Sequence, residues 1–290
     1  MIESVGIVGG GFMGAGIAES TARAGMPVTV VETSDELAAR VRGRIETSLA
    51  RAVKGGKLEE GEVAAVLERV SVATAIEAAA GADLVVEAVP EDLELKRSVF
   101  EVLGGAVGGD TIIASNTSSI PIAELASVTD RPERVLGLHF FSPVPVMKLV
   151  EIVVALDTSD ATVAEAELFV ERLGKHPIHT KDRSGFIVNM LLVPYLIAAV
   201  RMYEDGFASR EDIDDGMKLG AGHPMGPLTL ADFIGLDVLY AVCDSLYEEF
   251  KRSEYAPPPL LKRMVVSGHH GRKSGRGFYD YAPAREAATA

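Results

Sequence analysis

SVGIVGGGFMGAGIAESTARAGMPVTVVE, residues 4–32, is the stretch that decides the fold. It predicts a short strand, a glycine-rich turn, an Ala-rich helix and a second strand. The glycines follow the spacing G-x-G-x-x-G: the first permits a tight turn, the second lets the backbone approach a pyrophosphate, and the third lets the helix pack on the strand. Because the N–H groups at a helix N-terminus attract anions, we predict a dinucleotide site. Its expected cofactor contacts are Gly9, Gly11, Phe12, Met13 and Gly14.

The second strand ends at Glu32, a position whose side chain discriminates between NAD and NADP. A carboxylate at this position accepts hydrogen bonds from both ribose hydroxyls of NAD and repels the 2′-phosphate of NADP. Arg40 and Arg42 follow closely and are able to pair with a phosphate, so NADP stays open as the alternative. We expect NAD as the cofactor.

The composition limits the class of protein. The chain has 290 residues, of which 48% are hydrophobic, and a formal net charge of -14. This length suits one large domain or two medium ones. The acidic balance argues against nucleic acids or anionic membranes as partners through a general positive field. We expect a small-molecule ligand rather than either of these.

Three further features concern location and metals. The single cysteine, Cys243, excludes an intrachain disulfide and a cysteine-based zinc site, and its apolar neighbours favour a buried, inert thiol. No apolar run is long enough to span a membrane without interruption. The N-terminus enters a strand almost at once, which leaves no room for a signal peptide. We expect a cytoplasmic protein without a metal.

Strands and helices alternate over residues 1–183, and this order is typical of a parallel, doubly wound sheet. After residue 183 the β character is lost, so residues 184–290 are predicted to form an all-helical domain. Within it, residues 186–203, 210–219, 228–250 and 259–267 each read as one helix. The predicted fold class is therefore α/β, with an N-terminal Rossmann-type sheet and a C-terminal helical domain.

Residues 135–141 and 148–154 are predicted to be adjacent strands without a helix between them. An antiparallel hairpin centred on Pro145 would place His139 opposite Glu151, with Cβ atoms about 5 Å apart. Alcohol oxidation by a nicotinamide cofactor needs a base, and a histidine oriented by a carboxylate is suited to this task. A lone histidine at a strand end is more often a core residue, but the paired glutamate and the nucleotide site favour a catalytic His139.

Two more polar residues stand out. Ser118 lies just past a predicted strand's carboxyl end, where open α/β sheets bind ligands. Ser118 or Ser119 would serve equally well as the N-cap of the next helix. Asn189 lies within an apolar run, where a buried amide needs a partner, either structural or from a substrate.

Several motifs in order resemble those of the L-3-hydroxyacyl-CoA dehydrogenase family, in its short bacterial form. They are GGGFMGAGIA, DLVVEAVPEDLELK, ASNTSS, GLHFFSPVPVMKLVE, LGKHP, SGFIVNMLLVPYL, DIDDGMKLGAGHPMGP and GRKSGRGFYDY. The resemblance extends over nearly the whole chain and both predicted domains. Eight motifs in register are far more specific than the glycine fingerprint alone.

The resemblance implies a role for each matching position. His139 would be the general base, Glu151 its orienting partner, Ser118 a ligand of the substrate oxygen, and Asn189 a substrate contact from the helical domain. The implied cofactor contacts, besides Ser118, are Glu32, Glu91, Lys96 and Lys273.

The family's coenzyme A contacts fall on Ser48 and Lys54, with Lys57 as a substitute for Lys54. These residues lie in or just after the predicted basic helix 35–53, whose charges would otherwise be read as a solvated face. One cofactor position departs from the family, because Ser142 stands where an asparagine usually follows His-Phe-Phe. A hydroxyl cannot make the two-sided contact of an amide, so we expect weaker positioning of the nicotinamide.

The resemblance implies an NAD-dependent enzyme that interconverts (3S)-3-hydroxyacyl-CoA and 3-oxoacyl-CoA, with 3-hydroxybutyryl-CoA as the expected substrate and a place in fatty acid metabolism. It also implies a homodimer formed through the helical domain. Two alternatives stay open. One is a dehydrogenase of a free hydroxy acid or sugar acid, and the other is a nucleotide-binding protein without activity.

Overall fold

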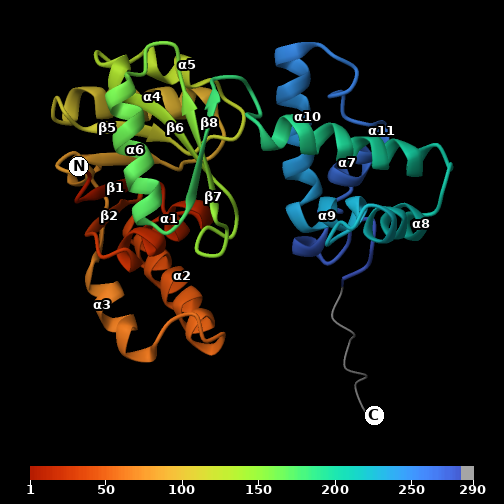
Figure 1. Cartoon of the computed structure of the whole chain (residues 1–290), viewed down its shortest axis with the longest axis horizontal. Coiled ribbons are helices and arrows are strands. Elements are labelled where there is room, and N and C mark those ends of the chain that lie inside the picture. Colours follow the sequence, from red (N-terminus) through yellow and green to blue (C-terminus); the bar gives the residue numbers. More distant parts are fainter. Residues whose placement is uncertain (282–290) are drawn as a thin grey trace. The chain divides into compact units, whose positions relative to one another are not determined.

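The computed structural model describes residues 1–281 of the chain. The chain forms two compact units, Met1–Phe186 and a second that begins at Ile187 (Figure 1). The last nine residues of the predicted helical domain, 282–290, lie outside the described residues.

The first unit contains one sheet of eight strands with the order of a doubly wound fold, β3-β2-β1-β4-β5-β6-β7-β8. The strands are β1 (Val5–Val8), β2 (Val28–Val31), β3 (Val70–Ala73), β4 (Leu84–Glu87), β5 (Ile112–Ser115), β6 (Val135–Phe140), β7 (Leu149–Val154) and β8 (His176–Lys181). All neighbouring strands are parallel except β6 with β7. The strand order reverses between β1 and β4, and such a switch point is where open α/β sheets bind ligands. The predicted Rossmann-type sheet is confirmed.

Helices cover both faces of this sheet. They are α1 (Phe12–Arg23), α2 (Asp35–Lys54), α3 (Val63–Glu68), α4 (Leu93–Ala106), α5 (Ile122–Ala126) and α6 (Asp160–Arg172), and short 3₁₀ turns occur at Glu60–Glu62, Ile76–Ala79 and Pro132–Arg134. One core includes Ile17 of α1 and Phe169 of α6, while a second includes Phe100 of α4. Successive residues of β4, Val85 and Val86, point into different cores. Burial on both faces explains the continuous apolar runs of the central strands.

The start of α1 differs from the starts of the other long helices in this unit. Ser34, Asp92 and Ser159 each accept a hydrogen bond from a backbone N–H in the first turn of α2, α4 and α6, as N-cap residues do. The N-cap of α1 is Gly11, which has no side chain to make such a bond. The N–H groups at this end therefore remain available to an anion.

The second unit is built from helices. They are α7 (Val188–Glu204), α8 (Arg210–Asp215), α9 (Pro227–Ile234), α10 (Leu236–Phe250) and α11 (Pro259–Val266), with a π-helical turn at Gly216–Gly220 and a 3₁₀ turn at Arg272–Ser274. The single helix predicted for residues 228–250 is wrong. Gly235 has a φ of 103°, which ends α9 and starts α10 at a new angle. The prediction failed because apolar residues recur with helical spacing on both sides of Gly235.

Cys243 is fully buried in the core of the second unit. Burial raises the pKa of its thiol to about 12, so the predicted inert thiol agrees with the structure. Among residues 1–281, no helix is both long and apolar enough to cross a membrane.

Candidate active site

The hairpin of β6 and β7 has the register that the sequence predicts: Gly137 pairs with Val153 and His139 with Glu151. The Nδ1 atom of His139 lies 2.6 Å from Oε2 of Glu151, and the two side chains are 5% and 0% exposed. A carboxylate only accepts hydrogen bonds, so Nδ1 carries the proton and donates it. In the neutral tautomer that donates from Nδ1, the Nε2 atom on the opposite side of the ring carries no proton, as a base requires.

Ser118 faces that second nitrogen. Its Oγ atom lies 3.1 Å from Nε2 of His139, in the loop after the carboxyl end of β5. Neither Ser118 nor Ser119 caps α5, because the free N–H groups of Ile122 and Ala123 bond to the carboxylate of Asp182, at 2.8 and 2.7 Å. Of the two readings that the sequence left open for Ser118, the N-cap is therefore wrong.

Glu91 holds the Ser118 loop in place. Its Oε1 atom accepts hydrogen bonds from the backbone N–H groups of Ser118 and Ser119, at 2.9 and 3.1 Å, and from the Thr117 hydroxyl at 2.6 Å. Burial alone would raise the pKa of Glu91, but the Lys96 ammonium and these hydrogen bonds lower it below its ordinary value. Its side chain is 40% exposed, which leaves a carboxylate accessible beside the predicted cofactor site.

Lys96, a predicted cofactor contact, lies in a buried group of charges. Its side chain is 1% exposed, and Nζ lies 2.7 Å from Glu87, 3.3 Å from Glu91 and 3.2 Å from the carbonyl oxygen of Val89. Glu87 also accepts a hydrogen bond from Ser115 at 2.6 Å. Sequence reasoning missed Glu87, although a charged residue inside the apolar strand DLVVEAV is a detectable signal of such a pair.

The glycine turn has the geometry that its spacing predicts at two positions. Gly9 has a φ of 100°, and a Cβ at Gly14 would overlap the carbonyl oxygen of Gly9. A Cβ at Gly11 would meet open space, which agrees with a position reserved for a ligand. The Glu32 carboxylate lies at this turn, where it accepts a hydrogen bond from the N–H of Gly10 at 2.8 Å.

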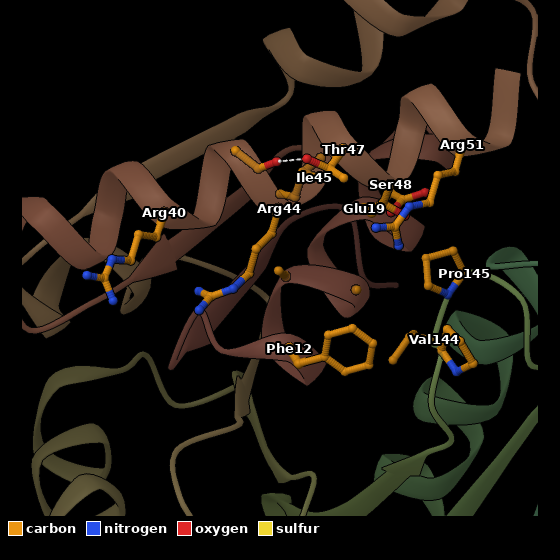
Figure 2. Close-up of a pocket in the computed structure, with 14 residues that line it drawn as sticks. Phe12, Glu19, Arg40, Arg44, Ile45, Thr47, Ser48, Arg51, Val144 and Pro145 are labelled. Atoms are coloured by element: carbon orange, nitrogen blue, oxygen red, sulfur yellow. Dashed lines mark hydrogen bonds between the residues drawn. The ribbon is translucent and has the colours of Figure 1, made fainter. Parts of the chain in front are cut away.

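Next to the turn lies a cavity of about 480 Å³. Figure 2 shows Arg44 and Arg51 extending from α2 toward this cavity, with Ser48 between them along the helix. Phe12, 64% exposed, lines the opposite side. Glu19, 1% exposed, also contributes to the lining, and burial raises the pKa of its carboxyl. The cavity therefore combines cations and apolar walls, which suits a phosphorylated ligand with an apolar part.

The remaining predicted residues lie at the following places. Lys54 is exposed at the end of α2. Arg40 and Arg42, the residues that left NADP open, pair on the surface with Glu36 and Glu46. Met13 is half-buried in the first turn of α1, and Ser142 is exposed after β6.

Two predicted residues belong to the second unit. Asn189 lies in the first turn of α7 and is half-buried rather than buried as expected. Lys273 forms an ion pair with Asp237, with Nζ 2.6 Å from Oδ1. Their roles stay predictions. Among residues 1–281, no group of three or more His, Cys, Asp or Glu side chains could hold a metal ion.

A dinucleotide turn and a buried His–Glu pair at the carboxyl edge of one sheet define the class of the NAD-dependent dehydrogenases. Residues 4–183 match the NAD binding domain of 3-hydroxyacyl-CoA dehydrogenase, and residues 185–281 match the C-terminal domain of the same family. The chain belongs to the 3-hydroxyacyl-CoA dehydrogenase family.

Individual relatives span almost the whole chain. A 3-hydroxybutyryl-CoA dehydrogenase of Mycobacterium tuberculosis is 51% identical, over 97% of this chain and 99% of the relative. The human mitochondrial hydroxyacyl-coenzyme A dehydrogenase is 43% identical, over 97% and 92%. The crystal structure of (S)-3-hydroxybutyryl-CoA dehydrogenase PaaH1 from Ralstonia eutropha is similar with a TM-score of 0.93 and 46% identity, over 98% of this chain and all of that one.

Proposed function

We propose that the chain is an NAD-dependent dehydrogenase that interconverts (3S)-3-hydroxyacyl-CoA and 3-oxoacyl-CoA, with 3-hydroxybutyryl-CoA and acetoacetyl-CoA as its pair of substrates. The observation that carries this proposal is the buried line from Glu151 through His139 to Ser118. A protein that only binds a nucleotide has no need of an oriented base. The names of the M. tuberculosis and R. eutropha relatives support the short-chain substrate.

In the oxidative direction, Nε2 of His139 takes the proton of the 3-hydroxyl group. Glu151 stabilises the imidazolium that this transfer creates, because the two atoms are already in contact. The Ser118 hydroxyl, 3.1 Å from Nε2, is placed to hydrogen-bond the same substrate oxygen. A bound NAD would supply the acceptor for the hydride that leaves C3 of the substrate. In the reverse direction His139 returns the proton to that oxygen.

The cofactor would be held by residues around the switch point. Gly9, Gly11 and Gly14 with the N-terminus of α1 suit the pyrophosphate, and Glu32 suits the adenosine ribose. Phe12 and Met13 follow the turn directly. Glu91, Lys96, Ser142 and Lys273 are the further cofactor contacts that we propose, and Lys96 also pairs with Glu87 and Glu91.

The coenzyme A part of the substrate would use the cavity beside α2. Ser48 lines it together with Arg44 and Arg51, and Lys54 lies one turn beyond Arg51, exposed to solvent. In a chain with a net charge of -14, this local group of cations favours the phosphates of coenzyme A. A free hydroxy acid would have no use for a cationic cavity of this size.

The two predicted domains would have different roles. We propose that residues 1–183 bind NAD and that residues 184–290 contribute to substrate binding and form a homodimer. Large apolar side chains on the surface of the second unit support the dimer, among them Leu191, Phe207, Leu219 and Val266, which are 73–84% exposed. A cytoplasmic location and a role in fatty acid metabolism are both consistent with this activity.

The decisive experiment follows the oxidation of NADH and NADPH with acetoacetyl-CoA and, in parallel, with free acetoacetate. Rapid NADH oxidation with the thioester alone supports the proposal. Turnover of the free acid would replace it by the hydroxy-acid alternative, and no turnover with either would favour a binding protein. Light scattering of the purified chain tests the dimer.

A further inference from the structure

The segment Asp182–Phe186 ends the first unit, and the chain continues from it directly into the second. Its last residue, Phe186, is 4% exposed and packs in the same core as Ile122 of α5 and Val153 of β7. The structure gives this segment more than a connecting role, because one end contacts His139 and the other contacts β7, the strand that carries Glu151.

The ring of Phe186 packs against the imidazole of His139 in a tilted arrangement. The two ring centroids are 5.4 Å apart with an interplanar angle of 56°. Phe141 contacts the same imidazole, with centroids 4.6 Å apart and an angle of 58°. His139 is thus bounded by two aromatic rings, by Glu151 at Nδ1 and by Ser118 at Nε2. With these four contacts around it, His139 is 4% exposed.

The backbone at Phe186 is in the left-handed region, with a φ of 50°, and follows Gly185 with a φ of 82°. Glycine adopts such angles freely, but a bulky residue does so at a cost that its surroundings must offset. A turn from Phe186 N–H to the carbonyl of Arg183, at 3.0 Å, closes the bend. This backbone conformation places the phenyl ring against the imidazole. The contact accounts for a bulky residue at a position that would otherwise favour glycine.

Asp182 fixes the other end of the segment. Its carboxylate bonds to the first N–H groups of α5, and its own N–H donates to the carbonyl of Val154 at the end of β7, at 3.1 Å. The segment is therefore tied both to the helix that follows the Ser118 loop and to the strand that carries Glu151. These bonds fix the start of the segment that ends at Phe186.

From this geometry we infer that Phe186 is a positioning residue for the base: its ring locks the His139 imidazole between Glu151 and Ser118 and shields it from water. The effect on turnover rests on the proposed function, whereas the shielding does not.

The test compares Phe186→Leu with Phe169→Leu. Phe169 is an equally buried core phenylalanine of α6, so its variant reports the general effect of losing a ring. Diethyl pyrocarbonate, which acylates unprotonated imidazole, is applied to each full-length protein, and the labelling rate of His139 is followed by peptide mass spectrometry. We expect His139 to be labelled severalfold faster in Phe186→Leu than in the wild type or in Phe169→Leu.

The same variants are assayed for turnover of acetoacetyl-CoA. Phe186→Leu should lower kcat by about tenfold to a hundredfold, because a small misplacement of a catalytic group is costly, while the NADH dissociation constant stays unchanged. Phe186→Gly loses the ring without backbone strain, so a similar loss of kcat there assigns the effect to the ring.

Unchanged labelling of His139 in Phe186→Leu overturns the inference, whatever the activity, and so does an equal loss of kcat in Phe169→Leu. A wild-type protein without activity on acetoacetyl-CoA would refute the proposed function, and the labelling experiment would still decide whether Phe186 shields His139.

Discussion

His139 and Glu151 lie opposite each other on antiparallel strands, with Nδ1 and Oε2 2.6 Å apart and both side chains almost completely buried. This contact fixes which imidazole nitrogen carries the proton. It also places a negative charge where a positive one forms when the base accepts a proton. The pair therefore combines orientation with electrostatic stabilisation in one hydrogen bond.

Glu151→Gln should lower kcat by about a hundredfold, because an amide keeps the size of the side chain but cannot stabilise the imidazolium. The NADH dissociation constant should not change, since the cofactor turn is untouched. Steady-state kinetics with acetoacetyl-CoA and fluorescence titration of NADH measure the two quantities.

His139→Ala should lower kcat by orders of magnitude while NAD binding persists. Because the two residues act as one unit, the double variant with Glu151→Gln should be little slower than His139→Ala alone. Additive losses in the double variant would show that Glu151 acts independently of the base, and an unchanged kcat in His139→Ala would remove His139 from that role.

Substitutions at two glycines of the turn should separate its structural role from its role in cofactor binding. A Cβ at Gly14 overlaps the Gly9 carbonyl oxygen, whereas a Cβ at Gly11 meets open space. Gly14→Ala should therefore destabilise the fold by about 3 kcal/mol, as overpacking does. Gly11→Ala should change stability by about 1 kcal/mol or less but weaken NADH binding about tenfold or more, because the methyl group occupies the space of the pyrophosphate. Thermal unfolding and NADH titration separate the two effects, and equal stability losses in both variants would contradict this reading of the turn.

Glu32→Gln tests the choice of cofactor. The amide oxygen is still able to accept the Gly10 N–H that Glu32 binds at 2.8 Å, so the turn should keep its shape. The lost charge should weaken NAD binding about tenfold and should not weaken NADP binding, because repulsion of the 2′-phosphate is gone. Dissociation constants of both cofactors check this, and an equal loss for both would mean that Glu32 does not contact the ribose.

Local patterns were sufficient to predict the sheet and the His139–Glu151 pair. The register of a hairpin follows from where its turn lies, and Pro145 marks that turn. The spacing of apolar residues does not report the positive φ at Gly235. The sequence pattern therefore predicted one helix where the structure has α9 and α10. The charge of Glu87 inside an apolar strand signals a buried partner, but the identity of that partner, Lys96 of a different element, does not follow from the local pattern. The same holds for Asp182, which caps α5 from 60 residues away.

Lys175 gives a prediction for the pH dependence of stability. Its side chain is nearly buried, and Nζ donates to the carbonyl oxygens of Val144 and Met147, at 2.5 and 2.8 Å. Burial, together with the charges of Lys148 and Arg23, lowers the pKa of Lys175 to about 8, although Glu19 opposes this. In the unfolded chain the pKa of a lysine is about 10.4.

Between these two values the folded protein releases the proton of Lys175 and the unfolded chain retains it. The unfolded state then binds more protons, so the contribution of Lys175 to stability rises with pH from about 8 to about 10.4. Lys175→Met lacks this contribution. The free energy of unfolding of the wild type minus that of Lys175→Met, from urea titrations, should therefore increase between neutral pH and about pH 10. In a Lys148→Met background, where a neighbouring positive charge is absent, the increase should begin at higher pH. A difference between wild type and Lys175→Met that does not vary with pH would show that Lys175 titrates alike in the folded and unfolded states.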